Sequence, residues 1–129
     1  MKTQTIPFKL VGGHVLLDLD GVPTFLDTGS QVSFGSVRSL NVLGTDYPIR
    51  SSLDGRITVA DVRDGLKKYA QVPKDFDFQA LLGVDILAGT TVRLDWMREK
   101  MTITRNPNTN VALLKATLPL TCSPKTGRK

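Results

Sequence analysis

The chain is poor in the residues on which several classes of enzyme depend. Its 129 residues include a single cysteine, Cys122, and a single histidine, His14. One cysteine excludes an intrachain disulfide, and there is no cluster of His and Cys side chains to hold a zinc ion. A catalytic cysteine needs a histidine base, so we interpret Cys122 as an ordinary thiol and His14 as a structural or surface residue of a strand. We expect no metal and no other cofactor.

Long apolar runs are also missing. No segment approaches the ~18 consecutive apolar residues that cross a bilayer as a helix, because charged residues interrupt every candidate. The first residues, MKTQTIPFKLVGG, have neither the apolar core nor the small-residue cleavage pattern of a signal peptide. We therefore expect a cytoplasmic protein that has no membrane segment and no membrane partner.

The overall composition is that of an ordinary globular domain. Glycine (11) and proline (7) are near average usage and hydrophobic residues make up 40%, which excludes collagen-like and low-complexity chains. A chain of this length forms one domain around one core, and it contains no repeat or linker. We predict a single domain over residues 1–122, followed by a basic, flexible tail at 123–129 (SPKTGRK).

The net charge of +5 is concentrated near the end of the chain. Residues 1–92 have a net charge of −1, whereas residues 93–129 have a net charge of +6. A solubilising chain end explains this distribution. Weak contact with nucleic acid is the alternative, but the basic residues are not interleaved with aromatic ones and no nucleic-acid motif is present. We therefore do not expect nucleic acid as a partner.

Short apolar segments separated by turn residues predict an all-β fold. In residues 14–20, Val15, Leu17 and Leu19 face one way, which is the period of a half-buried strand. Asp20-Gly21 is a hairpin signal that leads into a strand at 22–26. Many short strands with regular turns imply a closed or nearly closed β-barrel. Further elements are expected as short strands within 32–43, a hairpin over 46–60 with its tip at 53–56, a turn at 63–65, strands at 66–72, 76–82, 91–96 and 100–104, a short helix over 85–88 capped by Asp85, and a last strand or helical turn at 111–120.

The strongest short motif is residues 25–30, FLDTGS. An apolar strand leads into Asp27, and Gly29 permits a tight turn directly after it. We expect this turn to hold the Asp27 carboxylate at the rim of the barrel, with Thr28 bonding nearby backbone and Ser30 bonding the outer oxygen of Asp27. Asp-Thr-Gly by itself is weak, because an ordinary Asx turn at a strand end explains it equally well.

A second motif makes the first more specific. Residues 80–87 read ALLGVDIL, with Gly83 placed 56 residues after Asp27, and a hairpin of 92–96 with 101–103 follows. With both motifs in this order and spacing, the chain resembles the retropepsin-like (retroviral-type) aspartic peptidases from about Val15 to Thr104. In that family the Asp of the first motif is catalytic, here Asp27. The apolar-apolar-Gly segment, here Leu81-Leu82-Gly83, threads beside its loop. The resemblance implies a closed β-barrel with one short helix.

The chain contains one Asp-Thr-Gly sequence and no Asp-Ser-Gly. Because one carboxylate cannot supply both halves of a paired site, the resemblance implies a homodimer in which two Asp27 side chains meet across a two-fold axis. Two carboxylates ~3 Å apart share one proton. The ionised one takes a proton from the attacking water, and the protonated one stabilises the oxyanion. The predicted function is an aspartic endopeptidase whose partners are a second copy and a peptide or protein substrate.

The resemblance also assigns supporting roles. Thr28 would bond the backbone of the opposite subunit's loop, and Gly29 would line the floor of the substrate cleft. A flap over an extended substrate would be formed by the hairpin tip at Leu53, Asp54 and Gly55.

The hairpin tip departs from the family's pattern, because Gly55 is its only glycine and charged residues flank it. This leaves open a catalytically weak or inactive peptidase-fold module that binds extended peptides. We interpret Tyr47 as a core or rim residue rather than part of the flap. The segments that the resemblance would place in a dimer sheet are Thr3–Leu10 and Val111–Leu120.

Overall fold

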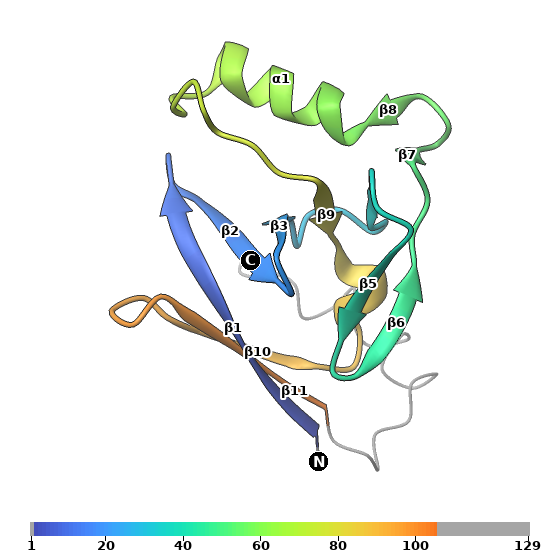
Figure 1. Cartoon of the computed structure of the whole chain (residues 1–129), viewed down its shortest axis with the longest axis vertical. Coiled ribbons are helices and arrows are strands. Elements are labelled where there is room, and N and C mark those ends of the chain that lie inside the picture. The colour runs from blue at the N-terminus through green and yellow to red at the C-terminus, as the bar shows by residue number, and fades with distance from the viewer. Residues whose placement is uncertain (1, 106–129) are drawn as a thin grey trace.

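A computed structural model describes residues 2–105, which form a mostly β fold with two helices (Figure 1). Cys122, the segment 111–120 and the predicted domain boundary between 122 and 123 lie outside these residues. No helix among the described residues is long and apolar enough to span a membrane. The elements in chain order are β1 Lys2–Val11, β2 His14–Leu19, β3 Val22–Leu26, β4 Phe34–Gly35, β5 Ser39–Val42, β6 Thr45–Pro48, β7 Ser52–Leu53, β8 Ile57–Thr58, α1 Val59–Tyr69, β9 Ala80–Leu82, α2 Val84–Leu87, β10 Thr91–Asp95 and β11 Lys100–Arg105.

Seven strands form one sheet in the order β10-β11-β1-β2-β3-β9-β4. The long strand β1 has two partners, because residues 2–7 pair with β11 and residues 8–11 pair with β2. The segment Thr3–Leu10 is therefore paired within its own chain. Strand β9 runs parallel to β3 and antiparallel to β4. Because β3 and β9 are parallel, the residues that follow them emerge at the same edge of the sheet.

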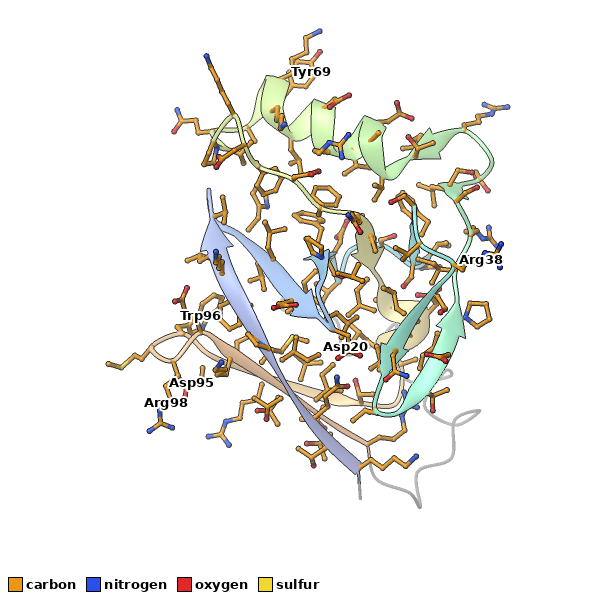
Figure 2. All side chains as sticks on the ribbon, viewed as in Figure 1. Asp20, Arg38, Tyr69, Asp95, Trp96 and Arg98 are labelled. Carbon is orange, nitrogen blue, oxygen red and sulfur yellow. The ribbon has the colours of Figure 1, made fainter. Side chains whose placement is uncertain are left out.

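Two expected hairpins of the seven-stranded sheet are confirmed, one in its middle and one at its β10 end. Strands β2 and β3 are joined by Asp20 and Gly21, which have φ values of 53° and 83°, as a two-residue hairpin turn requires. Strands β10 and β11 pair from Thr91 with Thr104 to Asp95 with Lys100. Their turn carries Trp96, labelled in Figure 2, whose ring meets Phe8 edge-on with centroids 5.6 Å apart.

Side chains alternate between two core clusters on opposite faces of the central strands. Strand β9 contributes to both, since Ala80 and Leu82 belong to one cluster and Leu81 to the other. The predicted inward face of β2 is confirmed, because its alternate residues share one cluster. We call the first the aliphatic cluster, with buried members Ile6, Phe8, Leu17, Leu19, Leu40, Val42, Leu43, Ala80, Leu82, Ile86, Leu87, Met101 and Ile103. We call the second the aromatic cluster, with buried members Phe25, Phe34, Val59, Phe76, Phe78 and Leu81.

Residues 59–69 form helix α1, where the sequence predicted a turn at 63–65 and a strand from 66. A capping box explains the helix start: the Asp61 amide donates to Thr58 Oγ1 (3.2 Å), and the Thr58 amide donates to the Asp61 carboxylate (2.9 Å). Val62 and Leu66 lie on one face and pack against the aromatic cluster. Helix α1 lies across the top of Figure 1, and side chains fill the space between it and the sheet (Figure 2).

The described residues do not form the expected closed barrel. The seven-stranded sheet is open, because its end strands β10 and β4 do not pair, and β5–β6 and β7–β8 form separate two-stranded sheets. Residues 66–69, which were expected to begin a strand, form the end of α1 instead. The strand predicted at 76–82 is also shorter, since Phe76 and Phe78 fill the aromatic cluster from an irregular segment before β9.

Candidate active site

Asp27 directly follows β3, at the edge where β3 and β9 both end. Leu26 pairs with Leu82, and the Asp27 amide donates to the Leu82 carbonyl at 3.0 Å. The ladder between the two strands therefore continues to the aspartate itself. This pairing fixes the backbone of Asp27 against a segment that is more than fifty residues later in the sequence.

Within residues 2–105, the turn after Asp27 holds one carboxylate oxygen and leaves the other without a hydrogen-bond donor. The Gly29 amide donates to Oδ1 at 3.0 Å, and the Ser30 amide donates to the Asp27 carbonyl at 3.1 Å. A Cβ at Gly29 would lie 3.2 Å from Oδ1, so glycine keeps this approach open. Among residues 2–105, no hydrogen bond reaches Oδ2. The half-buried side chain of Asp27 therefore presents one fixed and one available oxygen.

Thr28 and Gly29 are exposed beside this carboxylate. Within the part of the chain that the structure describes, the Thr28 hydroxyl makes no hydrogen bond, so the expected bond to nearby backbone is not formed. The bond that the resemblance implies would join Thr28 to a second subunit. Residues 28–29 thus form an exposed surface directly after the half-buried Asp27.

The expectation for Ser30 is wrong in its detail. Its hydroxyl donates to the Val32 carbonyl at 2.8 Å and accepts from the Val32 amide at 3.3 Å, so it faces its own loop and not the outer oxygen of Asp27. A short hydroxyl side chain commonly bonds backbone two residues away, and this local bond is the one formed here. Ser30 thus supports the loop without contacting the carboxylate.

Gly83 passes so close to residues 27–33, which we call the Asp27 loop, that no side chain fits. A Cβ at Gly83 would lie 2.6 Å from the Ser30 carbonyl oxygen and 3.0 Å from that of Val32. The next amide, that of Val84, donates to the Ser30 carbonyl at 2.8 Å. The two sequence motifs therefore lie side by side, and a glycine is required where they touch.

Sequence reasoning missed the connection between Ser33 and Asp85. The Ser33 hydroxyl donates to Asp85 Oδ1 at 2.6 Å, and the Ser33 amide donates to Oδ2 at 3.0 Å. The predicted cap by Asp85 is wrong, because α2 begins at Val84 and Gly83 occupies the N-cap position. The available signal was a serine between two apolar residues in a segment that becomes buried, but no local pattern names its partner.

The predicted hairpin tip is confirmed as a tight turn between β7 and β8. Asp54 and Gly55 have φ values of 56° and 73°, and the Arg56 amide donates to the Leu53 carbonyl at 3.1 Å. The tip residues 54–56 are exposed, whereas Leu53 packs against the aromatic cluster. Among the described residues, no hydrogen bond joins this tip to the Asp27 loop. The hairpin is instead anchored at its base, where the Gly35 amide donates to the Arg50 carbonyl at 2.9 Å.

Tyr47 and His14, which the sequence analysis did not assign to the site, both pack against side chains of their own chain. Tyr47 is half-buried against the aliphatic cluster and accepts a hydrogen bond from Arg105 Nη1 at 2.7 Å, which confirms a core or rim role. The ring of His14 packs against Phe25, with centroids 5.4 Å apart. Among residues 2–105, no group of three or more His, Cys, Asp or Glu side chains is arranged to hold a metal ion.

Comparisons with protein families, with curated proteins and with solved structures find no match to this chain. What the site can do is therefore argued from its own geometry. That geometry consists of one carboxylate on a tight turn, a neighbouring glycine-dependent strand junction, and an exposed surface beside the carboxylate.

Proposed function

We propose that the protein is an aspartic endopeptidase that hydrolyses peptide bonds with two Asp27 carboxylates, one from each subunit of a homodimer. The observation that carries the proposal is the way Asp27 is held. Its backbone is bonded to Leu82, its Oδ1 accepts the Gly29 amide, and its Oδ2 has no donor in residues 2–105. A fixed carboxylate with one available oxygen at an exposed turn is suited to face a second carboxylate.

A paired site explains how a single acidic residue per chain could catalyse hydrolysis. At close range two carboxylates share one proton, because both cannot readily be ionised together. The ionised Asp27 takes a proton from a water molecule, whose oxygen adds to the peptide carbonyl while the protonated Asp27 stabilises the oxyanion. When the C–N bond breaks, the amine nitrogen leaves with a proton from the dyad, which returns to its singly protonated state. The proposal includes the homodimeric arrangement of the retroviral aspartic proteases, in which the second subunit completes the site.

A second candidate function is a module that binds extended peptides without cleaving them. The hairpin that would serve as a flap favours this alternative. Its strands β7 and β8 have two residues each, and Leu53 is engaged in the core of its own chain. A flap restrained in this way would close poorly over a substrate, although an extended peptide could still bind beside the Asp27 loop.

The test compares the wild-type chain with Asp27→Asn on a proteome-derived peptide library, read by mass spectrometry between pH 3 and 7. The library is chosen because it detects cleavage even when sequence preference is narrow. We expect cleavage by the wild type and a loss of at least about 1,000-fold in Asp27→Asn, because the general acid and base are both removed. Asp27→Asn should keep the circular dichroism spectrum and the size of the wild type.

The matched control is Asp20→Asn, which removes the same charge from the exposed turn between β2 and β3 (Figure 2). Asparagine also tolerates the left-handed conformation found at this position. We expect this variant to cleave like the wild type. Cleavage that survives Asp27→Asn would refute the peptidase, whereas peptide binding without any cleavage would establish the second candidate function.

A further inference from the structure

Ser33 stands out because it is one of two buried polar residues in the described part of the chain. The other is Thr24, whose hydroxyl donates to the Val22 carbonyl two residues away, at 2.9 Å. Buried hydroxyls usually take such a nearby backbone partner. Ser33, which is 2% exposed, instead bonds residues that are fifty and more positions later in the sequence.

The contacts of Ser33 satisfy its amide and its hydroxyl together. Its Oγ accepts from the Gly83 amide at 2.8 Å and donates to Asp85 Oδ1 at 2.6 Å, while its amide donates to Asp85 Oδ2 at 3.0 Å. Asp85 Oδ1 also accepts from the Ile86 amide at 2.9 Å. Hydrogen bonds to a carboxylate are about twice as strong as neutral ones. The Ser33–Asp85 pair is therefore a strong connection between the Asp27 loop and the start of α2.

Three consecutive residues, 82–84, each form a hydrogen bond with the Asp27 loop, and the bond at Ser33 is one of them. The Leu82 carbonyl accepts from Asp27, the Gly83 amide donates to Ser33, and the Val84 amide donates to Ser30. The loop is thus attached at its beginning, middle and end. If the bonds at Ser33 are lost, the loop keeps the bonds that Ser30 makes and, directly beyond its end, the pairing of β4 with β9. The path of residues 31–33 between these two attachments is then less constrained.

We propose that Ser33 and Asp85 are positioning residues, which hold the Asp27 loop so that the two Asp27 carboxylates of the dimer face each other at the distance catalysis needs. This inference rests on the proposed function. Misplacement of a catalytic group by about 1 Å lowers a rate on the order of 100-fold. The pair acts through Asp27 and does not itself contact the reacting atoms.

The variant Ser33→Ala tests this role against Thr24→Val as the matched control, because each removes one buried hydroxyl. We expect kcat to fall about 100-fold in Ser33→Ala with KM little changed, and Thr24→Val to retain kcat. The difference between the two apparent pKa values of the pH–rate profile should also become smaller in Ser33→Ala, because carboxylates held further apart repel each other less. A merely structural role would lower thermal stability without moving the profile.

Hydrogen exchange of individual amides tests the same inference without any enzymatic activity. The Asp27 and Gly29 amides should exchange about 10-fold faster in Ser33→Ala than in Thr24→Val, which is the change expected from losing one or two buried hydrogen bonds. If Ser33→Ala does not fold, Asp85→Asn provides the second variant. It keeps an acceptor for the Ser33 hydroxyl but places an amide group near the Ser33 N–H, so the same shift is expected.

The outcomes separate this inference from the proposed function. If Asp27→Asn abolishes cleavage while Ser33→Ala and Thr24→Val have equal kcat and equal amide exchange, the positioning role is wrong and the peptidase stands. If no Asp27-dependent cleavage occurs, the peptidase is wrong, and the catalytic part of the inference is wrong with it. Faster exchange at Asp27 would then show only that the pair holds the loop.

Discussion

The Asp27 loop and the β7–β8 hairpin are both short turns, but they are held in different ways. The loop is bonded to Leu82, Gly83 and Val84, which lie about fifty residues later in the chain. The hairpin is closed by bonds within residues 52–58, and its exposed tip is attached through Leu53. Long-range bonds fix the segment that carries the carboxylate, whereas local bonds shape the segment proposed to cover it.

The largest effect on stability should come from adding a methyl group where the loop meets its partner segment. Gly83→Ala places a Cβ 2.6 Å from the Ser30 carbonyl oxygen, and backbone on both sides leaves little room for relaxation. We expect a loss of about 3 kcal/mol in the free energy of unfolding, measured by urea denaturation.

The hairpin supplies the comparison variant. At Gly55 a Cβ would meet nothing within 4 Å, and only the φ of 73° opposes a side chain. Gly55→Ala should therefore cost about 1 kcal/mol. Equal losses at the two positions would contradict the difference between loop and hairpin.

A smaller effect is expected where the hairpin joins α1. Thr58 ends β8 and is also the N-cap of the helix, where its hydroxyl accepts from the Asp61 amide. Thr58→Ala should lower the free energy of unfolding by about 1 kcal/mol, measured under the same conditions. Thr58→Ser, which keeps the hydroxyl, is the control. Similar stability of the two variants would show that the cap does not hold this end of the hairpin.

The capping box also predicts a pH dependence. The Thr58 amide, and then the Thr58 hydroxyl, donate to Asp61 and lower the pKa of its carboxyl below the ordinary 3.8. Because the folded pKa is the lower one, this contribution to stability is present above pH 3.8 and is lost as the pH falls through the folded value. An NMR titration should give Asp61 a higher pKa in Thr58→Ala than in the wild type, whereas an unchanged pKa would argue against the box.

Local patterns predicted the features that depend on neighbours in sequence. The alternation along β2, the Asp20-Gly21 turn and the β10–β11 hairpin follow from residue spacing alone. Helix α1 was missed because Gly65 and its flanking charges suggested a turn, although Thr58 and Asp61 have the spacing of a capping box.

The arrangement of the site depends on contacts that no local pattern specifies. The resemblance implied that Leu81-Leu82-Gly83 threads beside the loop of Asp27, and the structure places Gly83 against Ser30 and Val32 of that loop. The hydroxyl of Ser30 could have bonded either Asp27 or nearby backbone, and it forms its hydrogen bonds with the backbone of Val32. The partner of Ser33 is 52 residues away, so only the folded chain reveals it.

The most direct test of the paired Asp27 site is cleavage by co-refolded mixtures of wild-type chain and Asp27→Asn at constant total concentration. If each active unit needs two Asp27 carboxylates, activity falls as the square of the wild-type fraction and an equal mixture retains about one quarter. If one chain suffices, the decrease is linear and an equal mixture retains about one half, which would contradict the paired site.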